Sequence, residues 1–128
     1  MSKYADIIAR LEKAEGPDRE IDGFIALVEG WTFEKMEGDR SPYWRKPGVT
    51  DYFMRSDLPR YTASIDAAIA LVERILPDPA ILLGYGQDAL TKPWARISVS
   101  CGSSHGATLP LAILRALFRA LDAKEDRT

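Results

Sequence analysis

The segment Arg60–Pro77, RYTASIDAAIALVERILP, is the clearest single element in the sequence. Its apolar side chains recur with the spacing of one face of an α-helix, at Ile65, Ala68, Ile69, Val72 and Leu76. Ser64 is a residue type that caps the free N–H groups of a first helical turn, and Pro77 ends a helix. The pattern therefore predicts a central helix over about 64–76, with its apolar face in the core.

Two shorter helices are predicted before this segment, over about 3–14 and 17–29. Both carry apolar residues at helical spacing: Tyr4, Ile7, Ile8 and Leu11 in the first, and Ile21, Phe24, Ile25 and Val28 in the second. Pro17 suits the first turn of the second helix, and Gly30 can end that helix in a left-handed conformation. The tight link between the two predicts a helical hairpin.

A fourth helix is predicted over about 108–122, where Thr108 can cap the first turn. Its apolar surface is broad and includes Leu109, Leu111, Ile113, Leu114, Ala116, Leu117, Phe118, Ala120 and Leu121. So broad a surface is typical of a helix that is buried on more than one side, or of an oligomer contact. Self-association through 109–121 is therefore one expectation. Residues 124–128 are expected to form a charged, frayed tail.

Two strands are predicted between the last two helices, over about 80–85 and 94–101. In the second strand, apolar residues alternate with more polar ones, at Ala95, Ile97, Val99 and Cys101. This period of two is typical of a sheet with one packed face. A short polar connection joins the two strands, so we expect an antiparallel hairpin.

The segment 31–60 has no helical period, because Gly and Pro residues interrupt it. Short strands are predicted within it, at Thr32–Met36, Tyr43–Lys46 and Tyr52–Arg55. The segment is either a small irregular sheet or a functional excursion from the core.

Length and composition limit the classes of protein that the chain can represent. Its 128 residues suit one α+β domain, which we place at 1–123. A net charge of −2 argues against a global positive field for nucleic acid. One cysteine and one histidine exclude an internal disulfide and leave metal chemistry short of its usual ligands, so we expect no metal and no cofactor. No apolar run approaches the roughly 18 residues needed to cross a bilayer, so we expect a cytoplasmic protein without membrane contact.

Three segments resemble a family of small proteins that tailed phages and prophages encode. They are IIARLEKAEGPDREIDGFIALVEGWTF at 7–33, SPYWRKPGVTDYFMR at 41–55 and PRYTASIDAAIALVERILP at 59–77. The family is called the phage ABA-sandwich domain, and the resemblance extends from Ile7 to the last helix. It implies an α/β/α sandwich in a bacterial host cell. The family has no assigned activity, so the resemblance implies no site residues.

Basic and aromatic side chains interleave in one region, at Arg40, Tyr43, Trp44, Arg45, Lys46, Tyr52, Arg55 and Arg60. Aromatic rings can stack on bases while cations follow phosphates, so this region is a candidate for binding nucleic acid or another partner. Between Trp31 and Thr62, however, six Lys or Arg residues face five Asp or Glu residues. We favour the alternative in which large aromatic residues, Trp44, Phe53 and Tyr61, pin the segment to the core.

The segment CGSSHG at 101–106 precedes the last helix, whose first N–H groups could hold an anion together with Ser103, Ser104, His105 and Thr108. A thiol near an imidazole also suggests a nucleophile at Cys101 with a base at His105. Neighbours in sequence seldom converge in that way, and no third, orienting residue is identifiable. A buried thiol followed by a turn accounts for the same residues, so we expect no catalytic residues.

The sequence thus favours a non-enzymatic accessory protein of a phage or prophage, which binds a phage or host macromolecule through the 40–60 surface. A nucleic-acid-binding module on the same surface is the alternative. A small enzyme that uses Cys101 or His105 is the second alternative.

Overall fold

The computed structural model describes residues 4–34, 43–49, 52–84, 92–97 and 102–126. Its helices are α1 (Ala5–Lys13), α2 (Arg19–Val28), α3 (Ile65–Ile75) and α4 (Leu109–Asp126), with a short 3-10 helix at Arg55–Asp57. Its strands are β1 (Thr32–Glu34), β2 (Tyr43–Arg45), β3 (Tyr52–Phe53), β4 (Ile81–Gly84), β5 (Trp94–Ile97) and β6 (Ser104–His105). The α+β class and the four predicted helices are confirmed.

The predicted cap of α3 is confirmed, whereas its buried face differs from the prediction. Ser64 Oγ accepts a hydrogen bond from the N–H of Ala67 at 3.1 Å. The buried residues of α3 are Ala68, Leu71 and Val72. Ile65, which was expected in the core, is exposed, and the fully buried Leu71 lay outside the predicted stripe. The core-facing side is therefore rotated toward Leu71, because α3 packs against α4.

The start of α2 also differs from the prediction. Asp18 is its N-cap and accepts from the N–H groups of Glu20 and Ile21 at 2.8 and 3.2 Å. Pro17 therefore precedes the cap and does not lie in the first turn. At the other end Gly30 has a φ of 98°, which confirms the expected left-handed termination.

Helix α4 is the centre of the core and contacts α1, α3, β5 and β6. Thr108 caps its first turn, with Oγ1 accepting from the N–H of Leu111 at 3.5 Å. From Leu109 to Phe118 each apolar residue is buried within the chain. The expectation of self-association through 109–121 is therefore corrected, because no exposed apolar face remains there. The helix continues to Asp126, through positions that were expected to fray.

Strands β4, β5 and β6 form one antiparallel sheet, sheet B, in that order. Ala95 and Ile97 are fully buried while Trp94 and Arg96 are partly exposed, so the predicted alternation is confirmed for these positions. Positions 98–101 lie outside the described residues. Ser104 and His105 were expected in a loop but pair with β5 as β6.

Strands β1, β2 and β3 form a second antiparallel sheet, sheet A, in that order. Its register pairs Phe33 with Trp44, and Trp44 with Phe53. Of the two interpretations of 31–60, the small irregular sheet is therefore the one that the described residues show.

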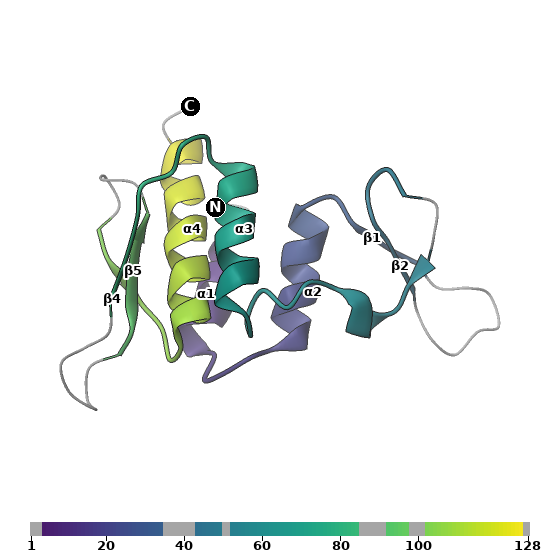
Figure 1. The fold of residues 1–128 in the computed structure, drawn as a ribbon, viewed down its shortest axis with the longest axis horizontal. Coiled ribbons are helices and arrows are strands. Elements are labelled where there is room, and N and C mark those ends of the chain that lie inside the picture. Colours follow the sequence, from purple (N-terminus) through teal and green to yellow (C-terminus); the bar gives the residue numbers. More distant parts are fainter. Residues whose placement is uncertain (1–3, 35–42, 50–51, 85–91, 98–101, 127–128) are drawn as a thin grey trace.

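The helices lie between the two sheets (Figure 1). Sheet B packs one face on α4, and the hairpin of β1 and β2 lies at the opposite end, beyond α2 (Figure 1). This order of layers differs from the α/β/α order that the resemblance implied, since no described helix covers the outer face of sheet B. No described helix is long and apolar enough to span a membrane.

Candidate partner-binding groove

A groove of about 420 Å³ lies between α2 and the first two strands of sheet A. Its lining residues are Arg19, Glu20, Gly23, Phe24 and Leu27 from α2, Phe33 from β1 and Trp44 from β2. Most of these groups are apolar, and the volume falls within the range of pockets that hold small molecules or side chains. We call this site the α2–β2 groove.

The helix side of the groove is shaped by Gly23. A Cβ atom placed there would lie 3.3 Å from Cη2 of Trp44, so the missing side chain allows the indole to pack closely against α2. One turn farther along, Leu27 is 46% exposed. The groove therefore has a floor of buried indole and a wall with an accessible leucine.

The strand side of the groove is formed by two aromatic rings, Phe33 and Trp44, and a second ring pair, Trp31 and Phe53, lies outside the groove lining. Phe33 contacts Trp44 in an edge-on arrangement with ring centroids 4.9 Å apart, and Trp31 contacts Phe53 at 5.5 Å. Phe33 is 46% exposed, whereas Trp44 is buried. The indole Nε1 of Trp44 has no hydrogen-bond partner among the described residues.

The charged groups beside the groove are paired with one another. Glu20 binds Arg10 at 3.2 Å, and the Arg10 guanidinium also lies 4.5 Å from the centroid of the Phe24 ring. Arg19 binds Asp22 at 2.8 Å. These cations are therefore already engaged, and the groove presents an apolar surface with a nearly neutral rim.

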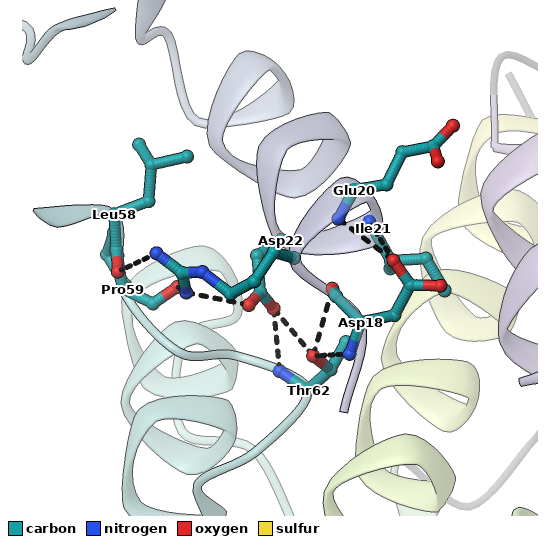
Figure 2. A network of polar contacts seen from close by, with 8 residues as sticks. Asp18, Glu20, Ile21, Asp22, Leu58, Pro59 and Thr62 are labelled. Atoms are coloured by element: carbon teal, nitrogen blue, oxygen red, sulfur yellow. Dashed lines mark hydrogen bonds and ion pairs between the residues drawn. The ribbon is translucent and has the colours of Figure 1, made fainter. Parts of the chain in front are cut away.

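A buried polar network holds α2 against the chain that leads into α3 (Figure 2). Asp22 is fully buried, and its carboxylate accepts from the N–H and hydroxyl of Thr62 and from Arg19. Arg19 also donates to the carbonyls of Leu58 and Pro59, at 3.0 and 3.3 Å. A buried carboxylate needs such donors, because burial without them is costly. The network thus fixes the side chain of Arg19 at the rim of the groove.

A second pocket, of about 310 Å³, is lined by Glu29, Trp31, Lys46, Pro47, Pro59, Tyr61 and Arg74. Arg74 binds the carboxylate of Glu29 through Nε at 3.0 Å and a terminal nitrogen at 2.8 Å, and the hydroxyl of Tyr61 donates to the same carboxylate. Burial opposes the charged form of Glu29, but the bonds from Arg74 and Tyr61 outweigh it and lower the pKa of Glu29.

Burial, and then the adjacent carboxylate of Glu29, raise the pKa of Tyr61. Tyr61 is therefore a hydrogen-bond donor at neutral pH. The carboxylate of Glu29 is bound by Arg74 through two hydrogen bonds and by the Tyr61 hydroxyl through a third. We interpret this cluster as a structural contact that holds the C-terminal end of α2 against α3.

The residues predicted to bind a partner are divided between two faces of sheet A. Trp44 lies on the face toward α2 and is buried, which confirms that it pins the segment to the core, as does the fully buried Tyr61. Tyr43 and Arg45 lie on the other face, where the hydroxyl of Tyr43 donates to Glu34 at 2.8 Å. The remaining candidates are scattered: Lys46 and Arg60 are exposed, Tyr52 is in β3, Arg55 begins the 3-10 helix, and Arg40 lies outside the described residues.

The residues predicted to hold an anion are arranged mainly as a strand. Ser104 is buried toward α4, where Arg119 donates to its Oγ at 2.8 Å and to the carbonyl of Ser103 at 3.3 Å. Arg115 donates to the carbonyl of His105 at 3.0 Å. Thr108 alone remains at the helix N-terminus. Cys101 lies outside the described residues, so neither the expected buried thiol nor the disfavoured alternative that pairs it with His105 is tested.

Sequence reasoning did not find the α2–β2 groove. Val28 belongs to the predicted apolar stripe of α2 but is 39% exposed, and Leu27 lies beside that stripe. The adjacent apolar residues Leu27 and Val28 were a signal that the apolar surface of α2 extends beyond the part that packs in the core. The contribution of Phe33 depends on strand register, which the sequence did not indicate.

Comparisons of the chain with protein-family models, with curated proteins and with solved structures find no significant match. Over the described residues, no group of three or more His, Cys, Asp or Glu side chains is placed to hold a metal ion.

Proposed function

We propose that this chain is a small binding protein, of phage or prophage origin, that holds an apolar segment of a protein partner in the α2–β2 groove. The observation that carries the proposal is the groove itself, where Leu27 and Phe33 are each 46% exposed above a floor of buried Trp44. Exposed apolar surface of this kind marks interaction sites, since a soluble domain otherwise gains by covering it.

A protein segment is the occupant that best fits the chemistry of the groove. Arg10 and Arg19, the cations beside it, already bind Glu20 and Asp22, so they offer no row of available positive charge for phosphates. A volume of about 420 Å³ accommodates on the order of two large apolar side chains. We therefore expect the partner to insert leucine, phenylalanine or similar residues from a short helix or extended segment.

The nucleic-acid alternative on the 40–61 segment has weaker support. Its largest aromatic residue, Trp44, is buried against α2. The indole is therefore not accessible to a base that approaches the opposite face of sheet A, where Tyr43 and Arg45 lie. Tyr43 is occupied by Glu34. The described cations next to these rings are Arg45 and the exposed Lys46, too few for a phosphate track, and both a stacking surface and such a track are needed.

The phage or prophage source and the cytoplasm of a bacterial host are proposed from the three resembling sequence segments alone. The genomic neighbourhood tests the source: structural or lysis genes of a tailed phage beside the coding sequence are the expected result. A neighbourhood of housekeeping genes in unrelated bacteria would remove that part of the proposal.

The groove is tested by selecting peptides from a random library displayed against the whole protein. We expect enriched peptides to share apolar residues, and we expect Leu27→Glu or Phe33→Glu to weaken their binding by at least about 10-fold, because each places a charge in an apolar contact. Leu82→Glu is the matched control, since Leu82 is 56% exposed on the other sheet. Peptides that bind equally well to the two groove variants would show that the groove is not the binding site.

A further inference from the structure

The second pocket, which contains Arg74 and Lys46, shares no described lining residue with the α2–β2 groove. We propose that this pocket binds the carboxylate of an apolar acid, with the carboxylate held by Arg74 and Lys46 and the apolar body against Pro47 and Pro59. The proposal does not depend on the peptide groove. We call this site the Arg74 pocket.

Arg74 is held in place and still has donors to offer. Its side chain is 51% exposed, and it binds Glu29 through Nε at 3.0 Å and Nη2 at 2.8 Å. The other terminal nitrogen, Nη1, donates to no acceptor among the described residues. A guanidinium is a planar fork of five N–H groups, so the edge formed by its two terminal nitrogens can bind a second carboxylate. Glu29 therefore orients this edge and leaves it available.

Lys46 brings a second cation to the same pocket. It is exposed, and it is near enough to Glu29 to help lower the pKa of that carboxyl. The ammonium group of a lysine is a point charge on a flexible stem, so it can follow a ligand that Arg74 has oriented. The two cations thus divide the work between geometry and charge.

The apolar walls of the Arg74 pocket are largely preformed. Trp31 is buried and contacts the ring of Phe53 with centroids 5.5 Å apart, and Tyr61 is fully buried. Pro47 lies against the end of α2, since a Cβ atom at Gly30 would lie 3.2 Å from the Cγ atom of Pro47. Packed rings and prolines have little conformational freedom left to lose when a ligand binds.

The size and charge of the pocket indicate the class of ligand. Its volume of about 310 Å³ is at the lower end of the range for small-molecule sites. A flat apolar body of roughly ten non-hydrogen atoms that carries one carboxylate suits this volume and both cations. A doubly charged phosphate suits it less, because the carboxylate of Glu29 lies beside the same cations and repels the additional charge.

The test titrates the whole protein with cinnamate and follows the two-dimensional NMR spectrum. We expect saturable changes at the Nε–H of Arg74 and the indole N–H of Trp31, with a Kd of about 1 mM, which is typical of a ligand of this size. Cinnamamide has the same shape without the charge and should bind at least about 10-fold more weakly. Phenyl phosphate should also bind more weakly than cinnamate.

Substitution of Lys46 tests one cation without disturbing the bonds between Arg74 and Glu29. Lys46→Gln should weaken cinnamate binding by at least about 3-fold, and Lys46→Arg should retain it, because only the first removes the charge. Lys124→Gln, at an exposed lysine near the end of α4, is the matched control and should have no effect. Arg74→Lys keeps the charge but loses the planar fork, so it should weaken binding more than Lys46→Gln. Circular dichroism checks that each variant is folded.

Two sources can supply such a carboxylate, a free aromatic acid and the C-terminus of a protein. Acetyl-glycyl-phenylalanine with a free C-terminus represents the second source, and its C-terminal amide is the control. Tighter binding of cinnamate than of the peptide supports a free acid as the ligand. Tighter binding of the peptide, with loss of binding in the amide, supports a protein C-terminus.

Three outcomes would overturn the proposal. The first is the absence of saturable changes at Arg74 and Trp31 with cinnamate and with the peptide. The second is binding of cinnamamide or phenyl phosphate as tight as that of cinnamate. The third is full retention of cinnamate binding by the folded Lys46→Gln and Arg74→Lys variants. Phe33→Glu in the groove should leave cinnamate binding unchanged, so failure of either proposal is visible without the other.

Discussion

The N–H and the hydroxyl of Thr62 both donate hydrogen bonds to one carboxylate oxygen of Asp22, at 2.8 and 2.9 Å. The same hydroxyl accepts from the N–H of Asp18 at 2.8 Å. This one threonine therefore joins the start of α2 to the turn before α3, two regions that are 40 positions apart.

Loss of this junction should destabilise the fold. We expect Thr62→Val to lower the free energy of unfolding by about 1–2 kcal/mol, because it leaves buried partners of the hydroxyl unsatisfied. Asp22→Ala should cost about 3 kcal/mol or more, since it removes the acceptor of two groups and the charge partner of Arg19. Urea denaturation measures both. Glu20→Gln, at an exposed pair, is the control and should stay within about 0.5 kcal/mol.

Stability at low pH should depend on Glu29. Its pKa in the folded state lies below the usual value of 4.5, so it stabilises the fold above that pH, and the contribution is lost as the pH falls through the lowered pKa. We expect Glu29→Gln to be less stable at neutral pH and to show a shallower loss of stability below about pH 5. Urea denaturation across this range tests the sign, and parallel curves for the two proteins would contradict it.

Stability at high pH should depend on Tyr61. Its pKa is raised above 10.0, so its contribution is complete below pH 10.0 and is lost as the pH rises through the raised pKa. Tyr61→Phe removes the titrating hydroxyl and should flatten the alkaline limb of the stability profile.

Among Gly16, Gly84 and Gly106, substitution by alanine should destabilise the fold most at Gly106. A Cβ there would lie 2.6 Å from the backbone nitrogen of Ala112, and backbone cannot move aside without disturbing α4. We expect Gly106→Ala to cost several kcal/mol, on the order of overpacking a core. Gly16→Ala, where nothing lies within 4 Å, should be tolerated. Thermal unfolding of the two variants measures the contrast.

Gly84→Ala should move a side chain and leave the backbone in place. The new methyl group would occupy the position of the Trp94 indole, which can rotate away. We expect a smaller loss of stability than for Gly106→Ala, together with a changed chemical shift of the Trp94 indole N–H in a two-dimensional NMR spectrum. Unchanged indole signals in a folded variant would contradict the described position of the ring.

Features that depend on neighbouring residues in sequence could be predicted. Ser64 and Thr108 cap their helices and Gly30 ends α2, because each acts through backbone groups within a few positions. The prediction that Pro17 lies in the first turn of α2 was wrong, although the deciding residue is its neighbour, since the carboxylate of Asp18 accepts from the first free N–H groups and makes Asp18 the N-cap.

Features that depend on packing partners could not be predicted. Leu71 is in the core in place of Ile65 because the position of α4 decides which side of α3 is covered. Ser104 and His105 form a strand only because β5 lies beside them. The α2–β2 groove brings Leu27 near Phe33 through the packing of α2 on sheet A, which periodicity does not contain. That Trp44 and Arg45 lie on opposite faces follows from the period of two in the predicted strand, but which of the two faces α2 does not.

The position of α4 in the chain has a consequence for synthesis. Residues Leu109–Asp126 leave the ribosome after α1, α3, β5 and β6, yet they contact all four of these elements. The apolar faces of the earlier elements are therefore without their main cover while the chain is being translated. The domain completes its core only after α4 emerges, and until then the earlier elements expose apolar surface of the kind that makes incomplete chains prone to aggregate.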